Sequence, residues 1–362
     1  MGDSFIKINT LSVSKNLADF VKNELLTGLD VNEKDFWDGF DKSINELAPI
    51  NKKLLEIRET LQSEIDLWLK KNRNGEFNHQ EYKNFLKEIG YLKEEGNDFK
   101  IDTKKLDREI SSIAGPQLVV PIMNSRYTLN AANARWVSLY DSLYGTDLIE
   151  SEETGSQKYD PLRGQEVIRY AREFLNDHFS INEIHWKDIN GFKIKGSDLK
   201  ILKDDKEFEL VNKNKFIGYR GEPNNPTTII LENNNLKIEI IINPKAFSAV
   251  QDAAGISDII VESAISTICD NEDSVAAVDS EDKILCYRNW LGLMKGTLKS
   301  VFEKDGKTLE RKLNPDRSYI SKDNKKEKLH GRSLLLVRNV GHLMTNSAII
   351  LEDGSEVPEG IM

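Results

Sequence analysis

The sequence has 362 residues, of which 39% are hydrophobic, so it is long enough for two or three domains with buried cores. Its 60 acidic residues outnumber its 50 Lys and Arg residues, and the net charge of −10 disfavours nonspecific binding to nucleic acid or to an anionic membrane. Two cysteines without a CxxC pair, no apolar run near ~20 residues and no signal-type N-terminus lead us to expect a cytoplasmic protein.

The first ninety residues are expected to form helices only. Apolar residues recur there at helical spacing, and Gly28 and Gly90 are placed as helix stops. The clearest apolar stripe consists of Leu54, Ile57, Leu61, Ile65 and Trp68. This pattern predicts an amphipathic helix whose stripe packs against other parts of the protein.

The middle of the sequence changes from helical to strand patterns. The continuously apolar run at 117–123 predicts a buried parallel strand, and helices are expected at about 131–143 and 161–178. Between 185 and 250, alternating residues such as those of 236–242 predict half-buried strands. We therefore expect a small mixed module inside the chain.

A second helical pattern follows an apolar strand that ends at Cys269. It predicts a helix at about 275–297, with a buried stripe that contains Ile284, Tyr287, Leu291 and Met294. After this helix, the Asp305-Gly306 pair is typical of a hairpin turn.

Three apolar strands share one form. They end at Met123-Asn124, Cys269-Asp270 and Val337-Arg338, and each delivers polar residues at its carboxyl end. In parallel sheets and barrels, ligands bind at that end of the strands. The polar residues after these strands are therefore candidates for a binding site.

Six carboxylates crowd into the stretch from 270 to 282, namely Asp270, Glu272, Asp273, Asp279, Glu281 and Asp282. The last three are expected to be a solvated helix start, where carboxylates are favoured by the helix dipole. Glu272 follows a strand and is expected to face the ligand. The pattern does not assign a role to Asp270 or Asp273.

Arg338 ends the most apolar of the three strands, so its charge needs an anionic partner. Two readings remain open. Arg338 forms a structural ion pair with an acid such as Glu272, or it clamps an anion or a developing oxyanion of a substrate.

Other well-known site motifs are absent from the sequence. No GxGxxG follows a strand, no GxxxxGK[ST] or GxSxG occurs, and the five histidines show no metal-ligand spacing. The residues alone therefore favour an α/β protein with polar side chains at the carboxyl ends of its strands. Such a site suits a reaction that is assisted by a metal ion or that passes through an anionic intermediate.

Long motifs then indicate a family. The stretches "AGPQLVVPIMNSRYTLNAANARWVSLYDSLYGTD", "FIGYRGEPNNPT", "ICDNEDSVAAVDSEDKILCYRNWLGLMKGTL" and "RSLLLVRNVGHLMTN" closely resemble malate synthase of the G type. The similarity runs from about residue 5 to the last residue. The resemblance implies condensation of acetyl-CoA with glyoxylate to give malate in the glyoxylate cycle, with Mg²⁺ as cofactor.

The resemblance also implies a domain organisation. The family fold is a (β/α)8 TIM barrel with an N-terminal helical clasp, an inserted α/β domain and a C-terminal plug. The expected segments are the clasp at 1–90, a linker and first barrel strand at 91–134, the inserted domain at 135–262, a barrel strand and helix at 263–297, a second part of the inserted domain at 298–332, and a barrel strand with its following loop at 333–362.

The resemblance implies functional roles for the residues of this sequence that match the family's motifs. Arg338 corresponds to the catalytic arginine that holds glyoxylate and stabilises the acetyl-CoA enolate, and Glu272 to an acid that orients metal-bound waters. The expected acetyl-CoA contacts are Val119, Arg126, Tyr127, Ser274 and Arg311. No direct Mg²⁺ ligand is expected in this chain.

The family's chain is about twice as long as this one. The Mg²⁺ ligands, the catalytic aspartate and the plug are expected beyond Met362, and about 110 residues remain here for a barrel that takes ~200 or more. We therefore expect an incomplete barrel and no activity from this chain alone. The full-length enzyme is expected to be a monomer. The alternatives are a non-catalytic acyl-CoA-binding or interaction module, or one half of a split enzyme.

Overall fold

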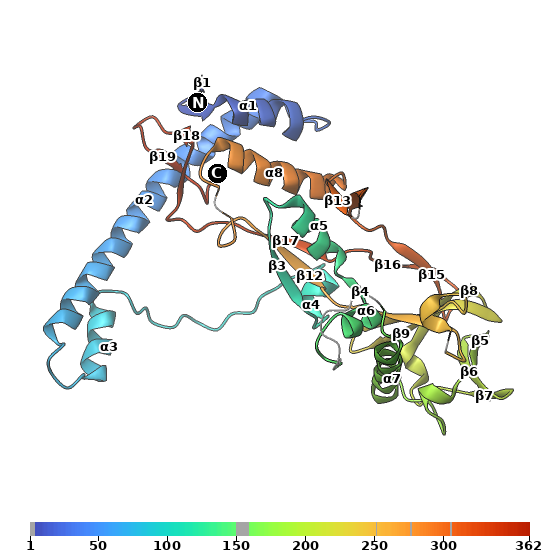
Figure 1. Cartoon of the computed structure of the whole chain (residues 1–362). Coiled ribbons are helices and arrows are strands. Elements are labelled where there is room, and N and C mark those ends of the chain that lie inside the picture. The colour runs from blue at the N-terminus through green and yellow to red at the C-terminus, as the bar shows by residue number, and fades with distance from the viewer. Residues whose placement is uncertain (1–3, 150–158, 251, 276, 305) are drawn as a thin grey trace. The chain divides into compact units, whose positions relative to one another are not determined.

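The computed structural model describes residues 4–149, 159–250, 252–275, 277–304 and 306–362 (Figure 1). The chain is mixed α/β and divides into two compact units. The first comprises Met1–Lys105, Asp270–Leu291 and Arg338–Met362, and the second comprises Leu106–Cys269 and Gly292–Val337. Within the described ranges, no helix is both long enough and apolar enough to span a membrane.

The first unit is dominated by α2 (Glu33–Lys71), a helix of 39 residues (Figure 1). Asn32 caps it by accepting a hydrogen bond from the Asp35 backbone N–H. Trp68, at the end of the predicted stripe, packs on α3 (His79–Glu88), with its ring centre 5.6 Å from that of Phe85. The earlier part of the stripe is exposed, at 59% for Leu54. The helix is confirmed, but the expected packing of its whole stripe is wrong for the described residues.

The expectation of helices only in the first ninety residues was also wrong. A four-stranded sheet is built from both ends of the chain, in the order β1 (Phe5–Ile8), β2 (Leu11–Ser14), β18 (Thr345–Ile350) and β19 (Glu356–Pro358). Asn9 turns the β1–β2 hairpin with a φ of 51°, which asparagine tolerates well. Val13 pairs with Ile349, and both are buried. Strands of four residues are too short to reveal their period in the sequence.

The remaining helices of this unit lie against the same core. They are α1 (Lys15–Phe20) with the π-helical turn Val21–Leu25, and most of α8 (Ser280–Lys295). The start of α8 is acidic as predicted, and Asp279 accepts a hydrogen bond from the Asp282 N–H. Ile284 is buried, whereas Met294 is 63% exposed, so the predicted stripe was wrong at its last residue.

The second unit contains a seven-stranded sheet of antiparallel neighbours. Its strands, in order across the sheet, are β16 (Lys326–Leu329), β15 (Arg317–Ser321), β8 (Phe216–Glu222), β9 (Asn225–Asn233), β10 (Leu236–Ile242), β11 (Ile256–Glu262) and β4 (Trp136–Ser138). A smaller sheet consists of β5 (Gly191–Lys195), β6 (Asp198–Lys203) and β7 (Lys206–Phe208). Short helical turns lie along the chain between these elements, namely Trp186–Asp188, Lys213–Lys215 and Phe247–Ala249, whereas α4 (Arg108–Ser111) precedes all of them.

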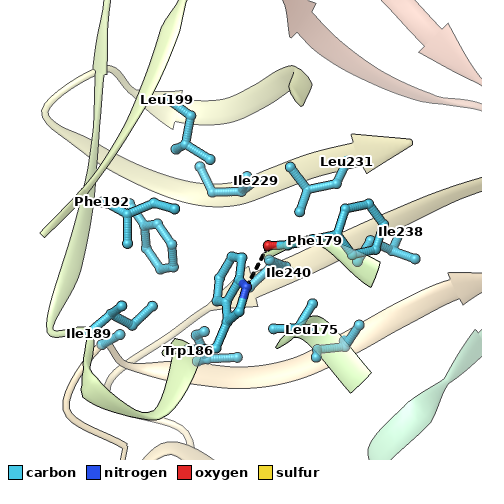
Figure 2. Close-up of a cluster of buried hydrophobic side chains, with 14 of the residues drawn as sticks. Leu175, Phe179, Trp186, Ile189, Phe192, Leu199, Ile229, Leu231, Ile238 and Ile240 are labelled. Atoms are coloured by element: carbon cyan, nitrogen blue, oxygen red, sulfur yellow. Dashed lines mark hydrogen bonds between the residues drawn. The ribbon is translucent and has the colours of Figure 1, made fainter. Parts of the chain in front are cut away.

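The core of this unit lies between the two sheets and α7 (Pro161–His178), which has the predicted bounds. Figure 2 shows Trp186 at its centre, fully buried, with its indole N–H donating to the Phe179 carbonyl at 2.7 Å. Ile238 and Ile240 of β10 are buried in this core as predicted, but Glu239 between them is buried as well, so the expectation of a half-buried strand was wrong for this stretch.

The helix expected at 131–143 is interrupted. The helix α5 (Ser125–Asn133) ends within this range. The chain then forms the short strand β4, which pairs with β11 so that Val137 lies opposite Val261. Ser138 then caps α6 (Leu139–Tyr144) by accepting from the Asp141 N–H at 2.9 Å. A strand of three residues that pairs with a distant partner leaves no local periodic signal.

The three apolar strands that the sequence singled out do lie side by side. They form a three-stranded sheet in the order β17 (Leu334–Arg338), β12 (Ser266–Asp270) and β3 (Gln117–Pro121). The Leu334 N–H donates to Ile265, and further along the Asn271 N–H donates to Arg338, so β12 and β17 run in parallel. Among the described residues this sheet is open at both edges.

A separate hairpin consists of β13 (Lys299–Lys304) and β14 (Lys307–Lys312). Lys304 aligns with Lys307, which confirms the predicted hairpin. Asp305 itself lies outside the described residues.

Candidate functional site

Arg338 and Asp270 end the neighbouring strands β17 and β12 and form a two-pronged ion pair. Arg338 Nε donates to Asp270 Oδ1 and Nη2 donates to Oδ2, each at 2.9 Å. The Asp270 side chain is fully buried, whereas the Arg338 side chain is 38% exposed. The pair is therefore anchored on the inside and open to solvent on the arginine side.

The chain that follows β12 folds back onto Asp270. Ser274 donates to Oδ2 from its hydroxyl at 2.6 Å and from its backbone N–H at 2.9 Å, and the Glu272 N–H donates to Oδ1 at 3.0 Å. These bonds fix both carboxylate oxygens. The pKa of Asp270 lies well below its usual range despite the burial of its carboxylate. The largest cause is the hydrogen bond from Arg338, and the hydrogen bonds from Ser274 contribute further. Asp270 is therefore ionised at neutral pH.

Two further carboxylates face the guanidinium of Arg338 at longer distances. Glu272 Oε2 is 3.4 Å from Nε, and Asp273 Oδ2 is 3.3 Å from Nη2. The expected pairing with Glu272 exists, but the main partner is Asp270, to which the sequence assigned no role. The Asp270 hydrogen bond raises the pKa of Arg338, so the guanidinium remains charged.

Arg338 keeps hydrogen-bonding capacity for a ligand. A guanidinium has five N–H donors, and the fork to Asp270 uses one on Nε and one on Nη2. Within the described part of the chain, the Nη1 hydrogens form no hydrogen bond. The arginine can therefore be held by Asp270 and bind a second anion at the same time.

The residues expected to contact acetyl-CoA are exposed. Val119 on β3 is 52% exposed, and Tyr127 on α5 is 56% exposed. Arg126 and Arg311 are exposed as well, on α5 and β14. The structure thus groups Arg338, Glu272 and Ser274 in the first unit and places these four residues in the second.

The described residues do not form a complete Mg²⁺ site. No group of three or more His, Cys, Asp or Glu side chains among them is arranged to hold a metal ion. The carboxylates of Asp270, Glu272 and Asp273 surround the Arg338 guanidinium instead of a common cation position.

Comparison with curated proteins explains this combination of features. A protein named malate synthase G from Halalkalibacterium halodurans is 45% identical over 99% of this chain and 50% of its own length. The chain is similar to malate synthase G over nearly its whole length. Proteins of the same name from Corynebacterium efficiens and Corynebacterium glutamicum are 44% and 47% identical over 99% and 97% of the chain and 48% of their own lengths.

Two family models match separate parts of the chain. The model described as the malate synthase N-terminal domain matches residues 16–78, and that described as the malate synthase G alpha-beta insertion domain matches residues 159–233. The latter range lies within the second unit and includes α7 and the strands β5 to β9. The chain spans about half the length of the curated relatives it matches.

Proposed function

We propose that the chain is part of a malate synthase of the G type, which condenses acetyl-CoA with glyoxylate and then hydrolyses the thioester with water to release malate and CoA. The observation that carries this proposal is the Arg338–Asp270 fork at the ends of parallel strands, in a chain 44–47% identical to malate synthase G. The carboxyl ends of parallel strands are the usual position of ligands in α/β folds.

In this proposal Arg338 is the catalytic arginine. Glyoxylate is an anion, and the Nη1 hydrogens of Arg338 offer it paired donors while Asp270 fixes the rest of the guanidinium. When acetyl-CoA loses a methyl proton, negative charge develops on its thioester oxygen. A preorganised guanidinium stabilises that charge as the methyl carbon attacks the aldehyde carbon of glyoxylate.

Glu272 and Ser274 complete this side of the site. The Glu272 side chain is 39% exposed and touches only one edge of Arg338, so its second oxygen can orient water around a bound Mg²⁺. Ser274 donates its proton to Asp270, which leaves its oxygen lone pairs for acetyl-CoA. The Mg²⁺ ligands and the catalytic base belong, in this proposal, to residues other than those described.

We propose Val119, Arg126, Tyr127 and Arg311 as acetyl-CoA contacts within the second unit, and Ser274 as a separate acetyl-CoA contact within the first. The two arginines suit the phosphates of CoA. The open sheet of β3, β12 and β17 supplies the first strands of a TIM barrel, because further parallel strands can pair with its two outer edges. We propose the same domain boundaries that the resemblance to malate synthase implies. We also propose that the enzyme is monomeric and cytoplasmic.

Isothermal titration calorimetry with acetyl-CoA tests this assignment. We expect micromolar binding that Arg311→Ala weakens about tenfold, because one charged contact to a phosphate is lost. Lys299→Ala is the matched control, since Lys299 also lies on the hairpin but is paired with Glu310. Equal affinity of the Arg311→Ala chain and the wild type would contradict the assignment.

A second candidate function is a non-catalytic acyl-CoA-binding module. The exposed arginines on α5 and β14 favour it, because guanidinium groups suit the phosphates of CoA. A split enzyme completed by another polypeptide is the remaining alternative. Release of CoA from acetyl-CoA, glyoxylate and Mg²⁺ separates these functions. When a complementing polypeptide is added, we expect turnover from a malate synthase part or from a split enzyme, and none from a non-catalytic module.

A further inference from the structure

Helix α5 is attached to the β13–β14 hairpin at both of its ends. Near its N-terminus, the guanidinium carbon of Arg126 lies 4.0 Å from the centre of the Phe302 ring. At its C-terminus, the Asn133 side chain donates to the Lys312 carbonyl at 2.9 Å and accepts from the Asn314 N–H at 2.8 Å. The hairpin therefore fixes the position of the helix that carries Arg126.

The strand register places Arg311 on the same hairpin face as Phe302. Phe302 aligns with Leu309, and Ser300 aligns with Arg311. Side chains alternate between faces along a strand, and directly opposed residues share a face. The face that holds the Arg126 guanidinium over Phe302 is thus the face from which Arg311 projects.

Charge is segregated between the two faces of this hairpin. The two carboxylates of the described strands, Glu303 and Glu310, belong to the opposite face by the same alternation, and Glu310 pairs there with Lys299 at 3.0 Å. Within the described ranges, neither Arg126 nor Arg311 forms an ion pair with a carboxylate. Two exposed and unneutralised guanidinium groups therefore share one face, as an anion-binding surface requires.

We propose that Phe302 is a positioning residue that holds the Arg126 guanidinium, so that Arg126 and Arg311 together bind the phosphates of CoA. Stacking uses the flat face of a guanidinium and leaves the N–H groups at its edge free to donate. It also restrains a long side chain before the ligand arrives, which reduces the entropy lost on binding. This inference rests on the proposed function, because it assumes that the chain binds acetyl-CoA.

A double-mutant cycle measured by calorimetry with CoA tests the role of Phe302. Phe302→Leu removes the aromatic face and is expected to weaken binding about threefold to fivefold, whereas Phe302→Tyr keeps the face and stays within about twofold of the wild type. In an Arg126→Ala background, Phe302→Leu is expected to cause no further loss. Val301→Ala, on the opposite face, is the control and leaves the affinity unchanged.

The outcomes distinguish this inference from the proposed function. If Phe302→Leu binds CoA as the wild type does, or weakens binding equally with and without Arg126, Phe302 does not act through Arg126 and the inference is overturned. The proposed function survives either result. If wild-type chain does not bind CoA, the proposed function fails and the inference fails with it.

Discussion

The carboxylate of Asp270 accepts two parallel hydrogen bonds from Arg338, and the Asn271 N–H donates to the Arg338 carbonyl at 2.8 Å. Backbone and side chain of Arg338 are thus both tied to the end of β12. Bidentate pairing of this kind fixes the orientation of a guanidinium as well as its distance. The arginine proposed to meet the substrate is held before any ligand arrives, which is the arrangement expected of a preorganised catalytic group.

The first prediction concerns Asp270→Asn. Asparagine keeps the shape of the side chain but replaces one acceptor oxygen with an NH₂ group, so we expect the free energy of unfolding to fall by about 1–3 kcal/mol at neutral pH. Asp273→Asn is the control, because Asp273 is 72% exposed, and it is expected to change stability by less than about 0.5 kcal/mol. Urea denaturation measures both.

The same variant has a defined pH dependence. The folded-state pKa of Asp270 is lowered, so its stabilisation is complete above the ordinary aspartate pKa of about 4 and is lost as the pH falls toward the lowered value. The stability difference between wild type and Asp270→Asn is therefore expected to be constant from about pH 5 to pH 8 and to shrink below about pH 4. A difference that grows on acidification would show that the fork is not the cause.

The second prediction concerns the buried pair of Lys283 and Glu359. Their side chains are 1% and 5% exposed, and they join α8 to the segment after β19. Glu359→Gln leaves a buried ammonium unpaired, so we expect a loss of about 3–5 kcal/mol. Replacing both residues with apolar ones, Lys283→Met and Glu359→Leu, is expected to recover much of it. A single-variant loss below about 1 kcal/mol would contradict the role of this pair.

The third prediction concerns Trp186 in the second unit. Trp186→Ala removes a fully buried side chain and its hydrogen bond to Phe179, so we expect a loss of about 3–5 kcal/mol. Trp186→Phe keeps most of the volume and is expected to lose less than half of that. Chemical denaturation measures both variants. An alanine variant as stable as the phenylalanine variant would mean that Trp186 does not organise this core.

The fourth prediction concerns the two cysteines. Burial raises the pKa of Cys269 to about 12 and that of Cys286 to about 11, and the reactive form of a thiol is the thiolate. At about pH 8 both thiols are therefore expected to resist a disulfide reagent in the folded chain and to react at once in denaturant. Rapid labelling of either thiol in the folded chain would contradict the burial described here.

The sequence indicated the parts of this structure that have long or continuous patterns. Helix α7 has its predicted bounds because Asp160 and Pro161 mark its start, and the three apolar strands meet in one sheet as expected. Arg338 is predicted from its position at the end of an apolar strand and Ser274 from the family motif, and both contact Asp270.

The remaining features depend on contacts between residues far apart in sequence. The sequence does not predict the role of Asp270, because an aspartate at the end of a strand gives no local sign of its partner, which lies 68 residues away. The strand β4 was missed for the same reason, since it pairs with β11 far along the sequence, whereas β1 and β2 were missed because four residues are too few to show a period. The packing of Phe302 beneath Arg126 likewise has no signal in either local sequence.

The most direct test of the central claim is to join this chain to the part of the Corynebacterium glutamicum relative that lies outside the match, and to assay CoA release with acetyl-CoA, glyoxylate and Mg²⁺. Our account predicts glyoxylate-dependent release that Arg338→Lys reduces by about 100-fold or more, because lysine cannot reproduce the fork to Asp270. Arg332→Lys, at an exposed position just before β17, is the matched control and keeps the rate. An Arg338→Lys protein that releases CoA as fast as its parent would contradict the account.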